Sequence, residues 1–238
     1  MFILRIIRLT DMSAQDKFIL ICGYIMAILI AIMSHELAHG IVAKWNGDDT
    51  AKTYGRLTIN PIKHFDVFGF ILILLIGFGW AKPVPVNPNN FKKRKLGLFT
   101  VSIAGVLTNF LLACISISLM FALKAGNVTM PENAFLQVLL KLLVYLFLFS
   151  GLINISLAIF NLLPFYPLDG YNVLSSIFKE DNKVLVFLRK YGFYILLILL
   201  FGGSILGQFN KYLDPIGLLL TTLTDKLFNL FSKLITGA

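Results

Sequence analysis

The sequence predicts an all-α protein that crosses a membrane several times. Of its 238 residues, 58% are hydrophobic and the mean hydropathy is +0.83, whereas about half of a soluble domain is apolar. The apolar residues gather in uncharged runs long enough to cross a bilayer, which takes about 20 helical residues. The basic residues lie between these runs, where lipid headgroups attract them. The net charge of +9 therefore indicates membrane lipids as partners, and no nucleic acid.

The first predicted helix covers residues 18–45, and its second half contains a His-Glu-x-x-His motif. At about 1.5 Å per residue, His35 lies about 26 Å along this helix, near one bilayer face but within membrane depth. Positions i and i+4 share a helix face, so the imidazoles of His35 and His39 can bind one metal ion. Glu36 beside them is a carboxylate that can take a proton from water, as in zinc peptidases.

The next segments break the helical pattern. Residues 54–61 mix β-forming residues with glycine and proline, and we predict a short β-strand or hairpin there, whose edge could hold an extended substrate. The apolar stretch 67–80 has only 14 residues, which suits a re-entrant segment better than a full span. Prolines 83, 85 and 88 then exclude a regular helix.

Four further membrane spans are predicted, at 96–123, 134–163, 191–209 and 216–235, the last weakened by two charges. Neither an internal repeat nor an appended soluble domain is apparent. We therefore expect residues 1–238 to form a single membrane-embedded domain.

The two histidines need a third ligand. His64 lies in a polar loop, where we expect a solvated side chain. Asp169 follows the proline-broken end of an apolar run, where an ionisable group is costly unless it has a partner. A metal ion would be that partner; the alternative is that Asp169 caps a helix beginning at Gly170. With His35 and His39 present, we favour the ligand.

The charge distribution predicts a topology. Most of the 21 basic residues lie in loops 44–66, 82–95 and 171–190, which the positive-inside rule assigns to the cytoplasm. This assignment requires that 67–80 makes no net crossing. It then brings His35 and Asp169 to the same face. We therefore predict a multi-pass protein of the cell membrane, with its N-terminus outside and its site near the cytoplasmic face.

The two motifs together resemble those of the site-2 protease family of intramembrane zinc metalloproteases, in its compact prokaryotic branch without PDZ or CBS domains. The first is His35-Glu-x-x-His39 and the second is Asn161-Leu-Leu-Pro-Phe-Tyr-Pro-Leu-Asp-Gly170. Three stretches between them also resemble this branch: Gly105-x-x-x-Asn109, 54–61 and 79–86.

The resemblance implies a three-helix catalytic core of helices 18–45, 96–123 and 134–163, within about residues 18–178. The helices 191–209 and 216–235 would be accessory. Family members cut within or next to the transmembrane segments of single-span proteins, so such proteins are the expected substrates.

The resemblance also implies one zinc ion (Zn²⁺) held by His35, His39 and Asp169, with Glu36 as the catalytic base. Zinc chemistry would then hydrolyse a peptide bond with water. Asn109 and Asn161 are candidates for contacts to the substrate backbone or the reaction intermediate. For each asparagine, the alternative is an interhelical hydrogen bond.

Two other functions are consistent with a buried His-His-Asp set. A metal-ion transporter would use these ligands for a passing ion, but it has no need of a base such as Glu36. A catalytically inactive scaffold that binds membrane helices would not need the full set of catalytic residue types. Iron is the alternative to zinc for this ligand set.

Overall fold

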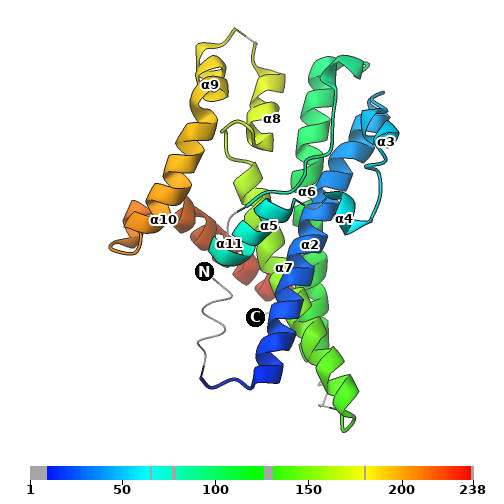
Figure 1. The fold of residues 1–238 in the computed structure, drawn as a ribbon, viewed down its shortest axis with the longest axis vertical. Coiled ribbons are helices and arrows are strands. Elements are labelled where there is room, and N and C mark those ends of the chain that lie inside the picture. Colours follow the sequence, from blue (N-terminus) through cyan, green and yellow to red (C-terminus); the bar gives the residue numbers. More distant parts are fainter. Residues whose placement is uncertain (1–9, 65, 77–78, 126–130, 180, 237–238) are drawn as a thin grey trace.

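The computed structural model describes residues 10–64, 66–76, 79–125, 131–179 and 181–236, and these are mainly helical, without a β-strand (Figure 1). Four helical stretches are long and apolar enough to cross a membrane: α2 (Ala14–Trp45), Arg94–Leu123 within α6 (Arg94–Ala125), α7 (Ala134–Asn161) and Lys183–Leu206. The all-α fold class predicted from the sequence is therefore confirmed.

Helices α2, α6 and α7 pack side by side as a bundle (Figure 1). Each of the three interfaces has a small apolar cluster: Leu20, Ala27 and Phe149 between α2 and α7, Ala113, Ile117 and Ile155 between α6 and α7, and Ala43, Phe91 and Val101 beside α2 and α6. Alanines at these contacts allow the helix backbones to approach closely, which is how helices associate in lipid.

The prolines after α7 end that helix as the sequence predicts. α7 stops at Asn161, three residues before Pro164, because a residue that precedes proline is disfavoured in helical conformation. A short irregular segment follows, and α8 (Asp169–Ile177) then packs against α6. This break brings the first turn of α8 back to the bundle.

The strand or hairpin predicted for 54–61 is wrong. This segment lies between the short helices α3 (Thr50–Thr53) and α4 (Pro61–His64) and forms turns and bends. Its first backbone N–H groups bond to carbonyls of the preceding turn, with Arg56 N donating to Ala51 O at 2.8 Å. These groups are therefore not available to a strand ladder, and Pro61 begins the next helix.

The stretch 67–80 contains α5 (Val67–Ile76), and its two ends lie together. Lys82 N donates to His64 O at 3.0 Å, so the chain leaves and returns at the same place. The residues that flank this segment therefore lie next to each other. Residues 77–78 of the predicted segment lie outside the described part of the chain.

Only one of the two predicted C-terminal spans is among the four spanning stretches. The prediction at 191–209 falls largely within Lys183–Leu206, which consists of α9 (Lys183–Leu197), the π-helical η2 (Ile198–Gly202) and α10 (Gly203–Leu206).

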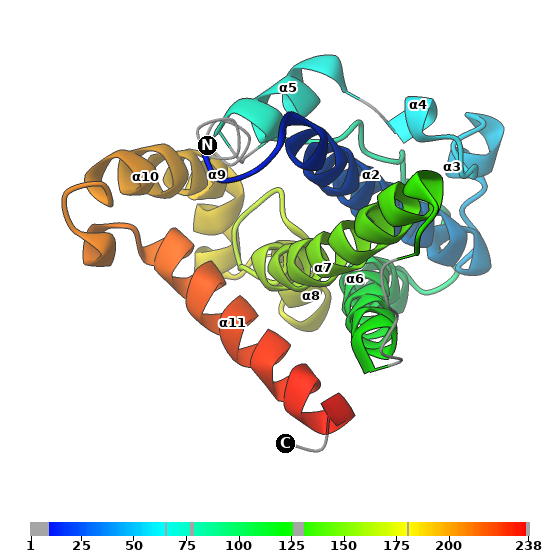
Figure 2. The same cartoon turned by 90° about the horizontal axis from the view of Figure 1, so that it is seen from below.

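The prediction at 216–235 matches the bounds of α11 (Pro215–Thr236), which carries Asp225, Lys226 and Lys233 and is not among the spanning stretches. Figure 2 shows α11 lying across the bundle, and its aromatic residues Phe228 and Phe231 pack on the cluster between α6 and α7.

The contact between α2 and α7 predicts a stability defect in Gly23→Ala. A methyl group at Gly23 would lie 2.9 Å from Tyr145 Cβ and 3.1 Å from Leu146 N, so α7 must move away. We expect the free energy of unfolding to fall by about 1–3 kcal/mol, as in other overpacked cores. Unfolding of the detergent-solubilised protein by titrated SDS measures it.

Gly202→Ala is the matched control, because a methyl group there meets no heavy atom within 4 Å. Equal stability of the two variants would contradict the close packing of α2 on α7.

Candidate metal centre

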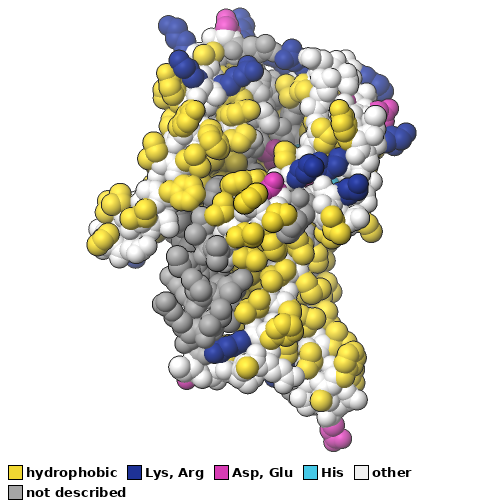
Figure 3. Space-filling view, viewed as in Figure 1, with side chains coloured by type: hydrophobic (Ala, Val, Ile, Leu, Met, Phe, Trp, Pro, Cys, Tyr) yellow, Lys and Arg dark blue, Asp and Glu magenta, His cyan; other side chains and the backbone are white. Residues whose placement is uncertain are grey.

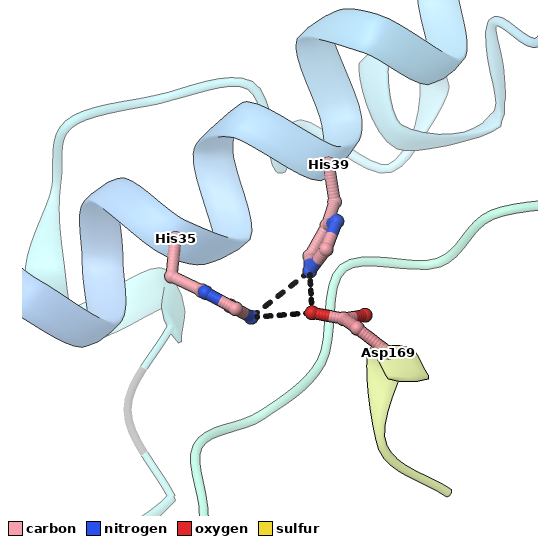
Figure 4. A group of neighbouring side chains, drawn as sticks. All are labelled: His35, His39 and Asp169. Atoms are coloured by element: carbon pink, nitrogen blue, oxygen red, sulfur yellow. Dashed lines mark hydrogen bonds and ion pairs between the residues drawn. The ribbon is translucent and has the colours of Figure 1, made fainter. Parts of the chain in front are cut away.

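His35 and His39 lie one turn apart on α2, and both imidazoles face Asp169 in the first turn of α8 (Figure 4). Asp169 Oδ2 is 3.2 Å from His35 Nε2 and 3.3 Å from His39 Nε2, and the two Nε2 atoms are 3.0 Å apart. The three side chains are only 10–12% exposed. The structure therefore brings together the three residues that the sequence singled out as ligands.

The far side of each imidazole is held by a hydrogen bond. His39 Nδ1 lies 2.7 Å from Val101 O on α6, and a carbonyl only accepts, so Nδ1 carries the proton. His35 Nδ1 lies 2.6 Å from Oδ1 of Asn109, also on α6. Protonation at Nδ1 leaves the Nε2 lone pair of each histidine directed at the centre.

With both imidazoles neutral and protonated at Nδ1, the centre has no donor for Asp169 Oδ2, which faces the two Nε2 atoms. Asp169 Oδ2 is buried and has no hydrogen-bond partner in the described part of the chain. It faces two Nε2 lone pairs, so three electron-rich atoms converge within 4.8 Å of one another. Such an arrangement is repulsive unless a cation lies between the atoms. Two imidazoles and a carboxylate form a ligand set that suits zinc and leaves a fourth position open.

Gly105 of α6 makes room for the two imidazoles. A methyl group at this position would lie 2.5 Å from His35 Cε1 and 2.7 Å from His39 Cε1. Because α6 approaches α2 this closely, the backbone carbonyl of Val101 and the side chain of Asn109 can both reach the two imidazoles. Helix packing and imidazole orientation are therefore set by the same contact.

Glu36, the predicted base, contacts an extended segment that runs beside α2. We call residues 79–87 the strap. Val84 N donates to Glu36 Oε2 at 2.8 Å, and the Val84 side chain is buried. This bond fixes the orientation of the carboxylate.

The buried carboxylate of Asp48 anchors the strap to the polar turn after α2. Asn87 N donates to Asp48 Oδ2 at 2.7 Å, and Asn90 Nδ2 donates to Oδ1 at 2.8 Å. Burial alone would raise the pKa of Asp48, but hydrogen bonds from Thr50, Asn87 and Asn90 outweigh it and lower that pKa below its usual range. Asp48 therefore accepts these bonds as a carboxylate.

The two asparagines predicted as substrate contacts are placed differently. Asn109 is fully buried and bonds to His35 on α2, which is the interhelical alternative considered from the sequence. Asn161 is partly buried and donates from Nδ2 to Leu157 O within its own helix at 3.0 Å. No hydrogen bond joins Asn161 to the ligands among the described residues.

The expectation of a solvated His64 is wrong. It is 2% exposed, and its Nε2 lies 2.9 Å from Thr58 O. The loop that carries it folds back on itself through this bond, so a polar sequence context did not imply exposure.

Sequence reasoning missed three groups around the site: the Val101 carbonyl, the Val84 N–H and the side chain of Asn154. The first two are backbone groups, which every residue type offers, so no sequence signal identifies them. Asn154 carried a signal, because it stands one turn after Ser150 inside a predicted span, where a polar side chain needs a partner.

Comparisons with known proteins agree with this chemistry. Residues 23–203 match the model of peptidase family M50, and this range includes both motifs. The chain is 40% identical over 182 residues to the "Putative zinc metalloprotease YwhC" of Bacillus subtilis, covering 74% of this chain and 78% of the relative.

Two more distant relatives carry similar names. The "Putative zinc metalloprotease Rip2" of Mycolicibacterium smegmatis is 29% identical over 199 residues, covering 79% of this chain and 69% of the relative. The "Putative zinc metalloprotease MJ0611" of Methanocaldococcus jannaschii is 30% identical over 152 residues, covering 63% and 68%. No solved structure matched significantly.

The family match covers most of the chain and includes the helix with the two histidines, the break after α7 and Asp169. With four helical stretches able to span a bilayer, the chain is a multi-pass membrane protein. The resemblance inferred from the two motifs is confirmed: this chain belongs to peptidase family M50, the site-2 protease family.

Proposed function

We propose that this protein is an intramembrane zinc metalloprotease that hydrolyses peptide bonds within or next to transmembrane segments of single-span membrane proteins. The observation that carries the proposal is the meeting of Asp169 on α8 with His35 and His39, which lie on a helix apolar enough to cross a membrane. Glu36 on the same helix supplies the base that hydrolysis requires.

His35 and His39 would hold the ion through Nε2, and Asp169 would hold it through Oδ2. Zinc in this position would polarise the scissile carbonyl and lower the pKa of water. Glu36 accepts a proton from the attacking water and returns it to the leaving amine. The Val84 N–H bond orients the Glu36 carboxylate for this transfer.

The proposed site lies near the cytoplasmic face of the cell membrane. Figure 3 supports this, because most Lys and Arg side chains on this face gather at the upper end of the molecule, where α6 begins and α8 and α9 meet. Hydrophobic side chains cover the flanks below. The segment that contains α5, whose flanking residues His64 and Lys82 are hydrogen-bonded, would enter the bilayer and return on the cytoplasmic side.

The bundle of α2, α6 and α7 would be the catalytic core, with the C-terminal helices as accessory parts of one domain. A metal transporter or an inactive scaffold would share the ligand set but would not hydrolyse a substrate. Cleavage of a substrate that depends on Glu36 separates the protease from both.

Glu36→Gln is expected to lower the rate of cleavage by at least about 100-fold, because the amide cannot accept the proton of the attacking water. The measurement co-expresses the wild-type chain or the variant with a tagged library of single-span membrane proteins and scores the fragments. Equal processing by the two forms would rule out the protease. Zinc uptake into proteoliposomes without any cleavage would favour the transporter instead.

His35→Ala and Asp169→Asn are expected to abolish stoichiometric zinc binding, because each removes one of the three ligands. Glu36→Gln should retain about one ion per chain. The matched control is His64→Ala, which removes the third histidine of the chain. That side chain contacts Thr58 O and is not part of the proposed ligand set. Elemental analysis of the purified proteins measures the zinc. Full zinc content in His35→Ala would refute this ligand assignment.

A further inference from the structure

A chain of buried polar side chains continues from the metal centre across the whole bundle. Asn109 on α6 and Asn154 on α7 are both 0% exposed, and Asn109 Nδ2 donates to Asn154 Oδ1 at 2.7 Å. The ligand set explains why Asn109 contacts His35. It does not explain why a second amide, on the third helix, is buried behind Asn109.

The orientation of the Asn154 amide is fixed at its far end. Asn154 Nδ2 donates to the backbone carbonyl of Ser150 at 2.8 Å and lies 3.2 Å from the Ser150 hydroxyl. A carbonyl accepts and never donates, so the nitrogen of the amide must face Ser150. The oxygen of Asn154 must then face Asn109.

This orientation passes to Asn109. Its nitrogen faces the oxygen of Asn154 and also lies 3.3 Å from Ala31 O, so its own oxygen faces His35 Nδ1 at 2.6 Å. The bond to Asn154 is the shorter of the two that hold this nitrogen. A carboxamide oxygen at Nδ1 requires the proton there, which leaves Nε2 unprotonated towards the metal centre.

We propose that Asn154 is a positioning residue for the metal ligand His35. Through Asn109 it selects the imidazole tautomer that can bind a metal ion. This inference rests on the proposed function, because it gives His35 the role of a ligand. His39 does not depend on Asn154, since its Nδ1 donates to the backbone carbonyl of Val101.

Without Asn154, the Asn109 amide keeps only its longer bond to Ala31 O at 3.3 Å, so the flipped amide orientation becomes less unfavourable. Its NH₂ group would then face His35 Nδ1, which favours the tautomer protonated at Nε2. That tautomer has no lone pair at the centre and cannot ligate. Second-shell partners of metal-bound histidines typically affect metal affinity by about 10–100-fold.

The test compares Asn154→Leu, which has the same branched arrangement of side-chain heavy atoms and no hydrogen-bonding group, with Ser156→Ala. Ser156 is the matched control, because it lies on the same helix and makes an interhelical bond of 3.0 Å to Thr224 that does not lead to the metal centre. Both variants are made in the full chain, purified in detergent and stripped of metal. Zinc affinity is measured by chelator competition.

A second readout is nitrogen NMR of ¹⁵N-histidine in the metal-free proteins. Only three histidines contribute, and single substitutions assign them. In Asn154→Leu we expect His35 to gain the Nε2-protonated tautomer, with zinc affinity about 10-fold lower or more. His39 should keep its Nδ1-protonated tautomer, and Ser156→Ala should match the wild type in both readouts.

An unchanged His35 tautomer together with wild-type zinc affinity in Asn154→Leu would overturn the inference. An equal loss of zinc affinity in Ser156→Ala would also overturn it, because any weakened helix contact would then suffice. Should Asn154→Leu fail to fold, Asn154→Ala removes the same hydrogen bonds without added bulk. The His35 tautomer and the zinc affinity of that variant then test the inference in the same way. If the wild-type chain binds no zinc, the proposed function fails, whereas the metal-free tautomer still decides the role of Asn154.

Discussion

Electron-rich atoms that face one another inside an apolar bundle repel, and the rest of this structure depends on resolving that repulsion. Two imidazole nitrogens and a carboxylate oxygen meet at 3.0–3.3 Å without a proton donor between them. Side chains that are only 10–12% exposed receive little relief from solvent. A divalent cation would relieve the repulsion, and the hydrogen bonds to the Nδ1 atoms prevent the imidazoles from turning away.

The three helices of the bundle hold the centre in different ways. α2 carries both histidines, α6 approaches them at Gly105 and contacts their Nδ1 atoms, and α7 supports α6 from behind through Asn154. A polar chain buried in this way is stabilising only when every member is satisfied. The polar residues of the bundle are therefore part of the site and also join its helices.

Hydropathy and motif spacing predicted much of this arrangement, because both depend on local sequence. The long spans follow from uncharged runs, the two histidines from i, i+4 geometry, and Asp169 from the cost of an ionisable group among apolar residues. The wrong predictions concern segments whose structure depends on hydrogen bonds to backbone groups. The turns at 54–61 satisfy their N–H groups locally, and His64 is buried by a bond to a carbonyl six residues earlier. The helix α11 matches its predicted bounds, but it lies across the bundle and packs on it through Phe228 and Phe231.

The strap joins Glu36 to the polar turn after α2 by a route that avoids His35, His39 and Asp169. Its anchor, Asp48, lies in a polar turn, and its Val84 N–H bonds directly to Glu36. A shift at the anchor would therefore change the direction of the Glu36 carboxylate while His35, His39 and Asp169 keep their positions. Under the proposed function, a change at the turn after α2 would alter turnover without altering metal binding.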